Sequence, residues 1–261
     1  ADAHCATRSC IDRGSVESGK YVGAVLRIAR RWHFSLFGNA GRTQSCGRHL
    51  SAVLPPMSAR GRFVTFEGID GSGKSTHIDA VAGTLRARGV NTLVTREPGG
   101  TPLGASLREL VLNHAMTRET ATLLMFAARA EHLAKVIRPA LAAGQWVLCD
   151  RFTDATYAYQ AGGRGMDERA IAELELWVHP DLQPDLTILF DVAPEVAEKR
   201  LAQARSADRF EAEPTAFFGA VRTMYLKRAA ANPARFFVVD GQQASDSVRE
   251  QLDRLMRQWN G

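Results

Sequence analysis

The amino-acid sequence predicts an α/β fold built on a parallel β-sheet. After Met57, short runs of β-branched and aromatic residues alternate with longer stretches of helical periodicity, as in strands joined by crossover helices. Residues 186–192 are apolar except for Thr187 and Asp191, and such a run suits a central strand that is buried on both faces. A glycine-rich loop joins the first strand run to the first helical stretch. These three observations favour a parallel sheet covered by helices.

The expected elements follow one another in a regular order. Strands are expected at residues 63–66, 92–95, 146–149, 186–192 and 236–239. Helices are expected near residues 76–88, 103–113, 119–143, 194–203, 214–231 and 245–259, with a further helical region before Leu186. Gly89 is a stop signal for the first helix, and Glu97-Pro98-Gly99-Gly100 is a turn after the second strand. The chain contains no internal repeat and no low-complexity segment.

Charge and composition divide the chain at Met57. The chain has 261 residues and a net charge of +5, and residues 1–56 alone carry eight basic and three acidic side chains. The remaining 205 residues carry 25 of each. We therefore expect a poorly structured, dispensable extension over residues 1–56, with Met57 as the natural first residue, and one domain over residues 57–261. An organelle transit peptide, rich in Arg and Ser and poor in acid, is the alternative interpretation of the extension.

Composition also excludes several classes of function. No stretch approaches the ~18 consecutive apolar residues of a membrane span, so no membrane partner is expected. The four cysteines show neither metal-ligand spacing nor the density of a disulfide framework, which favours a reduced, cytoplasmic setting. The balanced charge of residues 57–261 argues against a nucleic-acid partner.

The loop at residues 68–75, GIDGSGKS, matches the P-loop pattern G-x-x-x-x-G-K-[ST]. A strand precedes it and a helix follows, so backbone N–H groups and a helix N-terminus converge where a triphosphate would lie. Lys74 would neutralise the β- and γ-phosphates, and the hydroxyl of Ser75 would bind Mg2+. The expected ATP-binding residues are Gly68, Ile69, Asp70, Gly71, Ser72, Gly73, Lys74, Ser75 and Thr76.

A P-loop indicates a nucleotide but does not specify a reaction. The guanine-selecting Asn-Lys-x-Asp of GTPases is absent. Asp150-Arg151-Phe152 comes at the end of the third strand, and ligands bind at the carboxyl ends of parallel strands. Asp150 is therefore a candidate for Mg2+ or its water, and Arg151 for an acceptor phosphate.

Longer segments select the family. Arg151 is followed by TDATYAYQ at residues 153–160 and by Gly162-Gly163-Arg164-Gly165. Together with TREPGGT at 95–101 and LMFAAR at 124–129, these segments resemble bacterial thymidylate kinases over essentially all of residues 57–261. The resemblance implies transfer of the γ-phosphoryl group of ATP to dTMP to give dTDP, a P-loop kinase fold with a five-stranded parallel sheet and helices on both faces, and a homodimer.

The resemblance also implies roles for individual residues. Asp70 matches a P-loop carboxylate near the acceptor's sugar and phosphates, and Arg129 and Arg151 match arginines that grip the acceptor phosphate, a task that suits a planar fork. Phe126 matches the aromatic residue that stacks on thymine. Further acceptor-binding positions are Arg96, Pro98, Arg108, Thr156 and Gln160, with Tyr159 near the deoxyribose.

The sequence departs from the family pattern at the stacking residue. Many relatives have four residues from the stacking aromatic to the arginine, whereas Phe126 and Arg129 are three apart. Both spacings share a helix face, so Met125 is the alternative for part of that position.

The segment at residues 205–211, RSADRFE, falls where the family has its mobile lid. Gly71 stands at a P-loop position that holds arginine in some relatives, so the catalytic cation is expected from Arg205 and Arg209. With these two, the expected catalytic residues are Lys74, Asp70, Arg151, Arg205 and Arg209.

Two rival functions are consistent with a P-loop. One is another nucleoside monophosphate kinase or a deoxynucleoside kinase, which differs in its acceptor. The other is a nucleotide-binding regulatory module without turnover, against which the intact Lys74, Ser75 and Asp150 and both lid arginines count.

Overall fold

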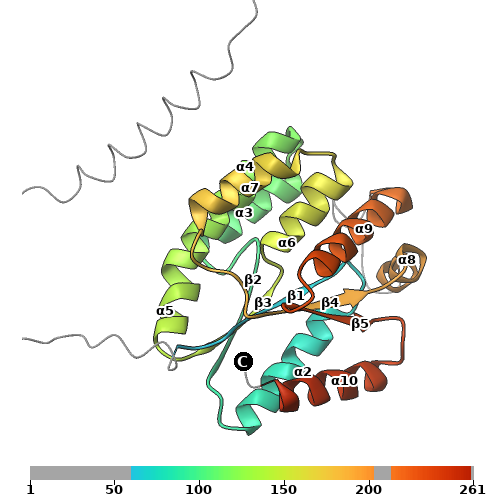
Figure 1. Cartoon of the computed structure of the whole chain (residues 1–261). Helices are drawn as coiled ribbons and strands as arrows, with labels where there is room; N and C mark the ends of the chain where they lie inside the picture. Colours follow the sequence, from blue (N-terminus) through green and yellow to red (C-terminus); the bar gives the residue numbers. More distant parts are fainter. Residues whose placement is uncertain (1–59, 203–212, 260–261) are drawn as a thin grey trace, which may run out of the picture. The chain divides into compact units, whose positions relative to one another are not determined.

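The computed structural model describes residues 60–202 and 213–259 (Figure 1). The predictions made for residues 1–56 and for Arg205 and Arg209 lie outside the described residues.

The described residues form one five-stranded parallel sheet, in agreement with the predicted fold class. Its strands are β1 (Phe63–Glu67), β2 (Thr92–Arg96), β3 (Trp146–Asp150), β4 (Leu186–Asp191) and β5 (Phe236–Asp240). Their spatial order is β2-β3-β1-β4-β5. The predicted strands are confirmed, with ends that differ by one residue.

The pairing register places the carboxyl ends of β1, β2 and β3 side by side, and each of these strands leads into one of the sequence motifs. Phe66 of β1 pairs with Asp150 of β3, and Asp150 in turn pairs with Arg96 of β2. Because the strands are parallel, the loops that follow β1, β2 and β3 leave the sheet at one edge. This edge therefore brings the P-loop, the turn after β2 and the Asp150-Arg151 segment together.

Helices cover both faces of the sheet (Figure 1). One face is covered by α2 (Lys74–Ala87) and α10 (Ser245–Gln258), and α9 (Thr215–Ala231) lies on the other with most of the remaining helices. These are α3 (Pro102–Asn113), α4 (Arg118–His132), α5 (Arg138–Ala142), α6 (Thr153–Thr156) and α7 (Glu168–Val178). The short helix α8 (Pro194–Ala202) follows β4, and two π-helical segments occur, η2 (Leu133–Ile137) and η3 (Tyr157–Gly163).

Three helices begin at polar caps that the sequence carries. The Thr101 hydroxyl accepts the N–H of Gly104 at 2.9 Å, with Pro102 at the first position of α3. Thr117 caps α4, and the Asp167 carboxylate caps α7. Each cap satisfies a backbone N–H that has no partner within its helix.

The helical stretch predicted for residues 119–143 is confirmed over residues 118–142, but it is not a regular α-helix throughout. It divides into α4, the π-helical segment η2 and α5. Pro139 lies in the first turn of α5. Proline has no N–H to donate, and its ring clashes with the preceding turn of a regular α-helix. The wider π-helical turn of η2 lies just before Pro139 and accommodates it.

The core follows from alternation along the strands. Val64 and Phe66 of β1 pack with Ile78 and Leu85 of α2, in a cluster that also contains Leu252 of α10. Phe63 points to the opposite face and packs with Ile137 and Leu141. Central strand β1 is buried along its whole length, so the residue that follows it starts from a rigid position.

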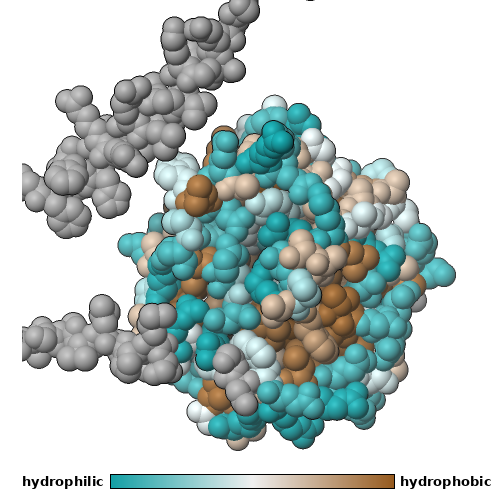
Figure 2. All heavy atoms as spheres, viewed as in Figure 1, coloured by the Kyte–Doolittle hydropathy of each residue, from teal (hydrophilic) through white to brown (hydrophobic). Residues whose placement is uncertain are grey.

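The surface in the same view is mostly hydrophilic, with an apolar area where α9 lies beside β4 and β5 (Figure 2). Among the described residues, no helix has both the length and the apolar composition needed to cross a membrane.

Candidate active site

The P-loop connects β1 to α2 and uses glycines where side chains cannot fit. Gly68 has φ +137°, and a Cβ there would lie 2.6 Å from the carbonyl oxygen of Phe190. Gly73 has φ +92° and caps α2. Glycine adopts such positive φ angles readily. Helix α2 begins at Lys74, two residues earlier than predicted, so its first turn is part of the loop.

Lys74 lies under the loop rather than in solvent. Its Nζ donates to the carbonyl oxygens of Gly68 at 3.0 Å and Ile69 at 2.9 Å. Burial, with the nearby charge of Arg151, lowers the pKa of Lys74 to about 8, although Asp150 and Asp70 oppose the shift. A buried ammonium group at this place is a strong attractor for a polyanion.

Asp70 and Arg151 pair across the edge of the sheet. Arg151 Nη2 donates to Asp70 Oδ1 at 2.7 Å, and the Tyr159 hydroxyl donates to Asp70 Oδ2 at 2.7 Å. Burial opposes ionisation of Asp70, but the charges of Arg151 and Lys74 outweigh it and hold the pKa of Asp70 well below its usual range. The carboxylate is therefore ionised at neutral pH.

Arg151 adopts a left-handed backbone conformation with φ +70°. Its N–H donates to Phe66 O at 3.0 Å, and its Nη1 donates to the Tyr225 hydroxyl at 3.1 Å. Non-glycine residues adopt this conformation only when the surroundings hold them in it, and such residues cluster at functional sites. The hydrogen bonds at both ends of Arg151 provide that restraint.

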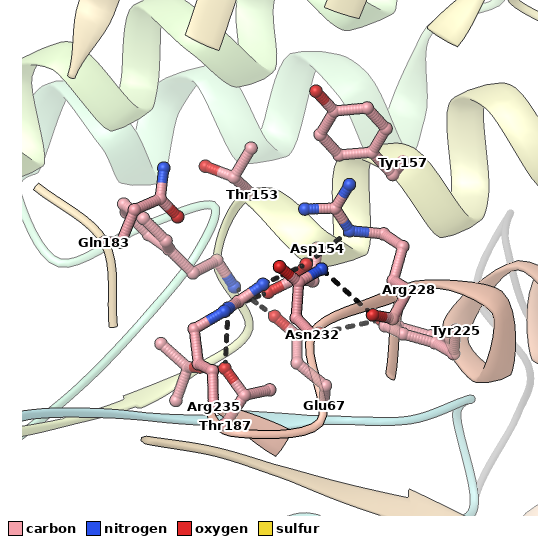
Figure 3. Close-up of polar contacts among 12 residues, drawn as sticks. Glu67, Thr153, Asp154, Tyr157, Gln183, Thr187, Tyr225, Arg228, Asn232 and Arg235 are labelled. Atoms are coloured by element: carbon pink, nitrogen blue, oxygen red, sulfur yellow. Dashed lines mark hydrogen bonds and ion pairs between the residues drawn. The ribbon is translucent and has the colours of Figure 1, made fainter. Parts of the chain in front are cut away.

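Glu67, the last residue of β1, hydrogen-bonds to Tyr225 (Figure 3) and to the backbone of the residue after Arg151. Its Oε1 accepts the N–H of Phe152 at 2.7 Å, and its Oε2 accepts the Tyr225 hydroxyl at 2.8 Å. Burial and the charge of Asp154 raise the pKa of Glu67 to about 8. Glu67 thus connects the start of the P-loop to the backbone that follows Arg151 and to Tyr225, which contacts the Arg151 side chain.

A buried charge cluster adjoins Glu67 (Figure 3). Asp154 is 1% exposed and accepts hydrogen bonds from Arg228 of α9 and from Arg235 Nη1, the latter at 2.6 Å. Arg235 also donates to the Thr187 hydroxyl of β4 at 2.8 Å. Two cations on one buried carboxylate satisfy its lone pairs and join α6, α9 and β4 into one support for the site.

One cavity lies beside the P-loop, between α3 and α4, and we call it the α3–α4 cavity. It is lined by Asp70, Glu97, Pro98, Arg108, Val111, Leu112, Met125, Arg129, Arg151, Phe152, Ala155, Thr156, Tyr159 and Gln160. Within the described part of the chain, two buried polar atoms of its lining have no hydrogen-bond partner, Arg129 Nη1 and Gln160 Nε2. Such donors indicate a polar ligand, because an unsatisfied buried donor is costly.

Another cavity, which we call the P-loop cavity, adjoins the α3–α4 cavity. It is lined by Asp70, Gly71, Gly73, Lys74, Ser75, Thr76, Arg96, Glu97, Arg108, Asp150, Arg151, Arg200 and Leu201. Four residues line both cavities, namely Asp70, Glu97, Arg108 and Arg151. A group bound in one cavity therefore faces a group bound in the other across a wall of charged side chains.

Most predicted site residues line one of the two cavities. Pro98, Arg108, Arg129, Arg151, Thr156, Tyr159 and Gln160 line the α3–α4 cavity. Arg96 lines the P-loop cavity instead, together with Ser75 and Asp150. Gly68, Ile69 and Ser72 form the back of the loop and are buried.

Phe126, which the resemblance implies as the stacking residue, is buried in the core. It is 2% exposed and packs in a core cluster with Tyr157, Ala161 and Ile171. Met125, one residue earlier on α4, lines the α3–α4 cavity. Among the described residues, α4 contributes Met125 and Arg129 to the lining of this cavity, and Phe126 is not part of it. The geometry favours the alternative, Met125.

Several residues of the site were not found from the sequence. Glu97 accepts Arg129 Nε at 2.8 Å on one oxygen and contacts His132 Nδ1 at 3.0 Å on the other. Arg200 on α8 lines the P-loop cavity. The sequence offered a signal for His132: it lies three residues after Arg129, so the two share one face of the predicted helix. It offered none for Glu67, which reads as the end of a buried strand.

Known proteins resemble this chain over the same region. The family model described as thymidylate kinase matches residues 66–252. A thymidylate kinase from Methylobacillus flagellatus is 56% identical over 200 residues, covering 77% of this chain and 98% of the relative. A thymidylate kinase from Cupriavidus metallidurans is 60% identical over 197 residues, covering 76% of this chain and 98% of the relative.

A solved structure agrees with these relatives. The crystal structure of thymidylate kinase from Ehrlichia chaffeensis superimposes with a TM-score of 0.62 at 33% identity, and the match covers 76% of this chain and 99% of that one. The matched region contains the P-loop, Arg129, Arg151 and the Glu97 turn. On the family match, the identities and the cavity geometry together, the chain belongs to the thymidylate kinase family.

Proposed function

We propose that the protein transfers the γ-phosphoryl group of ATP to dTMP, giving dTDP, with ATP in the P-loop cavity and dTMP in the α3–α4 cavity. Family membership supports this reaction and makes the chain a kinase of dTDP synthesis. The main supporting observation is that Asp70, Glu97, Arg108 and Arg151 line both cavities and form the wall between them. In-line transfer requires donor and acceptor phosphates to meet, and this wall is where they would meet.

On the nucleotide side, the backbone of residues 68–75 would hold the phosphates of ATP, with Thr76 in the first turn of α2. Lys74 would exchange its contacts with the carbonyl oxygens of Gly68 and Ile69 for the β- and γ-phosphates. Its buried ammonium group is stabilised when anionic phosphate oxygens replace neutral carbonyl oxygens. This change is favourable only with the nucleotide bound.

On the acceptor side, the two arginines have different surroundings. Arg129 Nη1 and Gln160 Nε2 have no hydrogen-bond partner among the described residues. Arg129 would use this donor on the phosphate or sugar of dTMP, and Gln160 would use its own on the base. Arg151, already bound to Asp70, would hold the acceptor phosphate at the wall. The cavity's other lining residues, among them Pro98, Arg108, Met125, Thr156 and Tyr159, would enclose the base and deoxyribose.

Mg2+ fits the residues at the P-loop cavity. Asp150 Oδ1 is buried and, among the described residues, has no hydrogen-bond partner, and Asp150 and Ser75 line the same cavity. A hydroxyl and one carboxylate are a typical protein contribution to a Mg2+ site that is completed by phosphates and water. When bound, Mg2+ would neutralise charge on the β- and γ-phosphates.

The side chains of the site would contribute to catalysis by electrostatic stabilisation. The acceptor phosphate of dTMP is itself the nucleophile, so no side chain has to abstract a proton from a hydroxyl group. Lys74 and Arg151 would stabilise charge on the oxygens of the transferred group, and Asp70 would fix the direction of Arg151.

A coupled ADP-release assay tests the proposed acceptor. We expect turnover with dTMP to exceed that with dUMP, dCMP, AMP and thymidine by at least about tenfold in kcat/KM, because the cavity would be shaped to one base and one phosphate. Higher turnover with another nucleotide or with thymidine would establish the alternative acceptor class. ATP binding without ADP release on any of them would establish a regulatory module.

We also propose a homodimer through α3, α4 and α7. Helix α4 contacts both α3 and α7. The three helices carry large exposed apolar side chains, namely Leu103 and Leu110 on α3, Leu123 on α4, and Leu176 and Trp177 on α7. Exposed apolar groups on neighbouring helices suit burial against a second copy. Light scattering should give twice the chain mass, and Leu110→Glu should reduce it to the chain mass.

The dispensable extension and the cytoplasmic location remain predictions from the sequence. Both follow from the composition of residues 1–56 and from the sparse cysteines. Expression of the full chain with a C-terminal tag, followed by cell fractionation and mass measurement, tests them together. An organelle-associated, shortened product would establish the transit-peptide alternative.

A further inference from the structure

His132 is a buried polar residue outside the lining of both cavities. It is the last residue of α4 and is 0% exposed. Its Nε2 lies 2.7 Å from Thr95 Oγ1 at the end of β2, and its Nδ1 lies 3.0 Å from Glu97 Oε1. One imidazole thus connects α4 to both the end of β2 and the loop that follows it.

Glu97 divides its two oxygens between His132 and Arg129. Oε1 faces His132 Nδ1, and Oε2 accepts Arg129 Nε at 2.8 Å. The carboxylate is 4% exposed in its side chain, so water contributes little to its orientation. Losing the contact at Oε1 would let the carboxylate rotate away from Arg129.

Arg129 is held at every position except one. Its Nε is bound by Glu97, its Nη2 donates to Thr156 Oγ1 at 3.0 Å, and its guanidinium carbon lies 4.8 Å from the ring centroid of Phe126. In the part of the chain that the structure describes, its buried Nη1 has no partner, and Arg129 lines the α3–α4 cavity. The contacts of Nε and Nη2 fix the guanidinium and thereby the direction of its remaining donor, Nη1.

The loop after β2 fits closely against the imidazole. Gly100 has φ +75°, and a Cβ there would lie 2.3 Å from His132 Nε2. The same loop carries Glu97 and Pro98, both of which line the α3–α4 cavity. His132 therefore fixes the loop by packing as well as by its hydrogen bonds.

We propose that His132 is a positioning residue that donates its Nδ1–H to Glu97 and thereby aims Arg129 Nη1 at the acceptor phosphate or sugar. The inference rests on the proposed function, since it assumes that Arg129 contacts dTMP. A carboxylate offers only acceptors, so the contact at Oε1 requires the proton on Nδ1. The Thr95 hydroxyl, which can donate or accept, completes the ring's contacts at Nε2.

Two substitutions separate the two ends of the imidazole. In His132→Asn the amide nitrogen falls near the place of Nδ1 and can donate to Glu97, whereas the amide of His132→Gln falls near the place of Nε2 and reaches only Thr95. We expect His132→Gln to raise KM for dTMP about tenfold with kcat changed much less, and His132→Asn to raise it about threefold or less. KM for ATP should stay unchanged in both.

His179 supplies a matched control. It is also 0% exposed, with Nε2 2.7 Å from Thr153 Oγ1 and Nδ1 3.0 Å from the carbonyl oxygen of Leu182. We expect His179→Asn, His179→Gln and the His132 variants alike to lower the Tm, because each removes a buried, hydrogen-bonded ring. The KM values of the two His179 variants for dTMP should agree with each other within about twofold, because neither end of this ring touches Glu97.

The outcomes distinguish this inference from the proposed function. If Arg129→Ala leaves KM for dTMP unchanged, the acceptor assignment fails. If Arg129→Ala raises KM while His132→Asn and His132→Gln have equal KM values, His132 has only a structural role and the inference is overturned.

A measurement on the parent protein covers the case in which the His132 variants do not fold. Imidazole nitrogen shifts of His132, assigned through contacts to Thr95 and Gly100, should show the proton on Nδ1. A ring protonated on Nε2 alone would overturn the inference.

Discussion

Arg151 Nη2 and Asp70 Oδ1 lie 2.7 Å apart, joining the loop after β3 to the P-loop. The two residues line both cavities, so their pair stands in the wall between donor and acceptor. Tyr159 contacts both partners, Arg151 at 3.0 Å and Asp70 at 2.7 Å. Together with the charge of Lys74, this three-residue unit lowers the pKa of the Asp70 carboxylate, and it holds the Arg151 guanidinium in one orientation.

Asp70→Asn should impair activity and change the acid side of the stability profile. Removing the charge loosens Arg151, so we expect kcat/KM for dTMP to fall at least about tenfold. The folded pKa of Asp70 lies below its unfolded value, so its stabilising contribution exists above the ordinary carboxyl pKa of about 3.9 and is lost as pH falls below it. Thermal unfolding of parent and variant should therefore differ at pH 6 and converge in acid. A constant difference in Tm at all pH values would contradict the pairing.

Lys74→Met should abolish transfer without unfolding the protein. We expect kcat to fall by about 10² or more, because one charge-stabilising donor is lost. Since the folded pKa of about 8 lies below the ordinary lysine value, the unfolded chain binds more protons between about pH 8 and 10.4, and stability rises with pH there. The parent should gain Tm relative to Lys74→Met over this window. Near-normal turnover with unchanged Tm would refute the P-loop assignment.

Met125 and Phe126 should respond in opposite ways to substitution. Met125→Ala removes part of the cavity wall, so KM for dTMP should rise about tenfold with a small change in Tm. Phe126→Leu alters a buried core ring instead and should cost about 1 kcal/mol of unfolding free energy with KM nearly unchanged. Steady-state kinetics and denaturant unfolding of both variants decide the question. A larger rise in KM for Phe126→Leu than for Met125→Ala would restore Phe126 as the stacking residue.

The source of the catalytic cation can be located by three alanine variants. Arg205→Ala or Arg209→Ala should lower kcat by about 10² with a much smaller change in KM, if one of them acts on the transferred group. Arg200→Ala is the comparison, because Arg200 lines the P-loop cavity from α8. If Arg205→Ala and Arg209→Ala both keep kcat within about threefold of the parent, the lid mechanism is wrong. A large loss in Arg200→Ala alone would assign the cation to α8.

Deletion of residues 1–56 should leave kcat, KM and Tm unchanged. The prediction follows from the change in charge and composition at Met57, and the family match begins only at residue 66. Parallel kinetics and thermal unfolding of the full and shortened chains provide the measurement. Aggregation or lost turnover of the shortened chain would show that the extension supports the fold.

The sequence alone determined the features that depend on local chemistry. The P-loop glycines, Lys74 and Ser75 are recognisable because a phosphate-binding loop needs those residue types at fixed spacing. The central strands β1, β3 and β4 were readable because the inner strands of a parallel sheet are buried on both faces and carry largely apolar runs. The strand–loop–helix order then predicted which edge would carry the site.

Tertiary structure decided which side chains share that edge. Phe126 and Met125 both lie on an amphipathic helix, and only the packing of α4 against Tyr157 and Ile171 places Phe126 in the core. Glu67 reads as part of a buried strand, yet its carboxylate lies between the N–H of Phe152 and the hydroxyl of Tyr225, 158 residues away. His132 meets Glu97 through a contact that spans 35 residues. Periodicity along the chain carries no information on such pairs, because their geometry depends on how strands and helices from distant segments pack together.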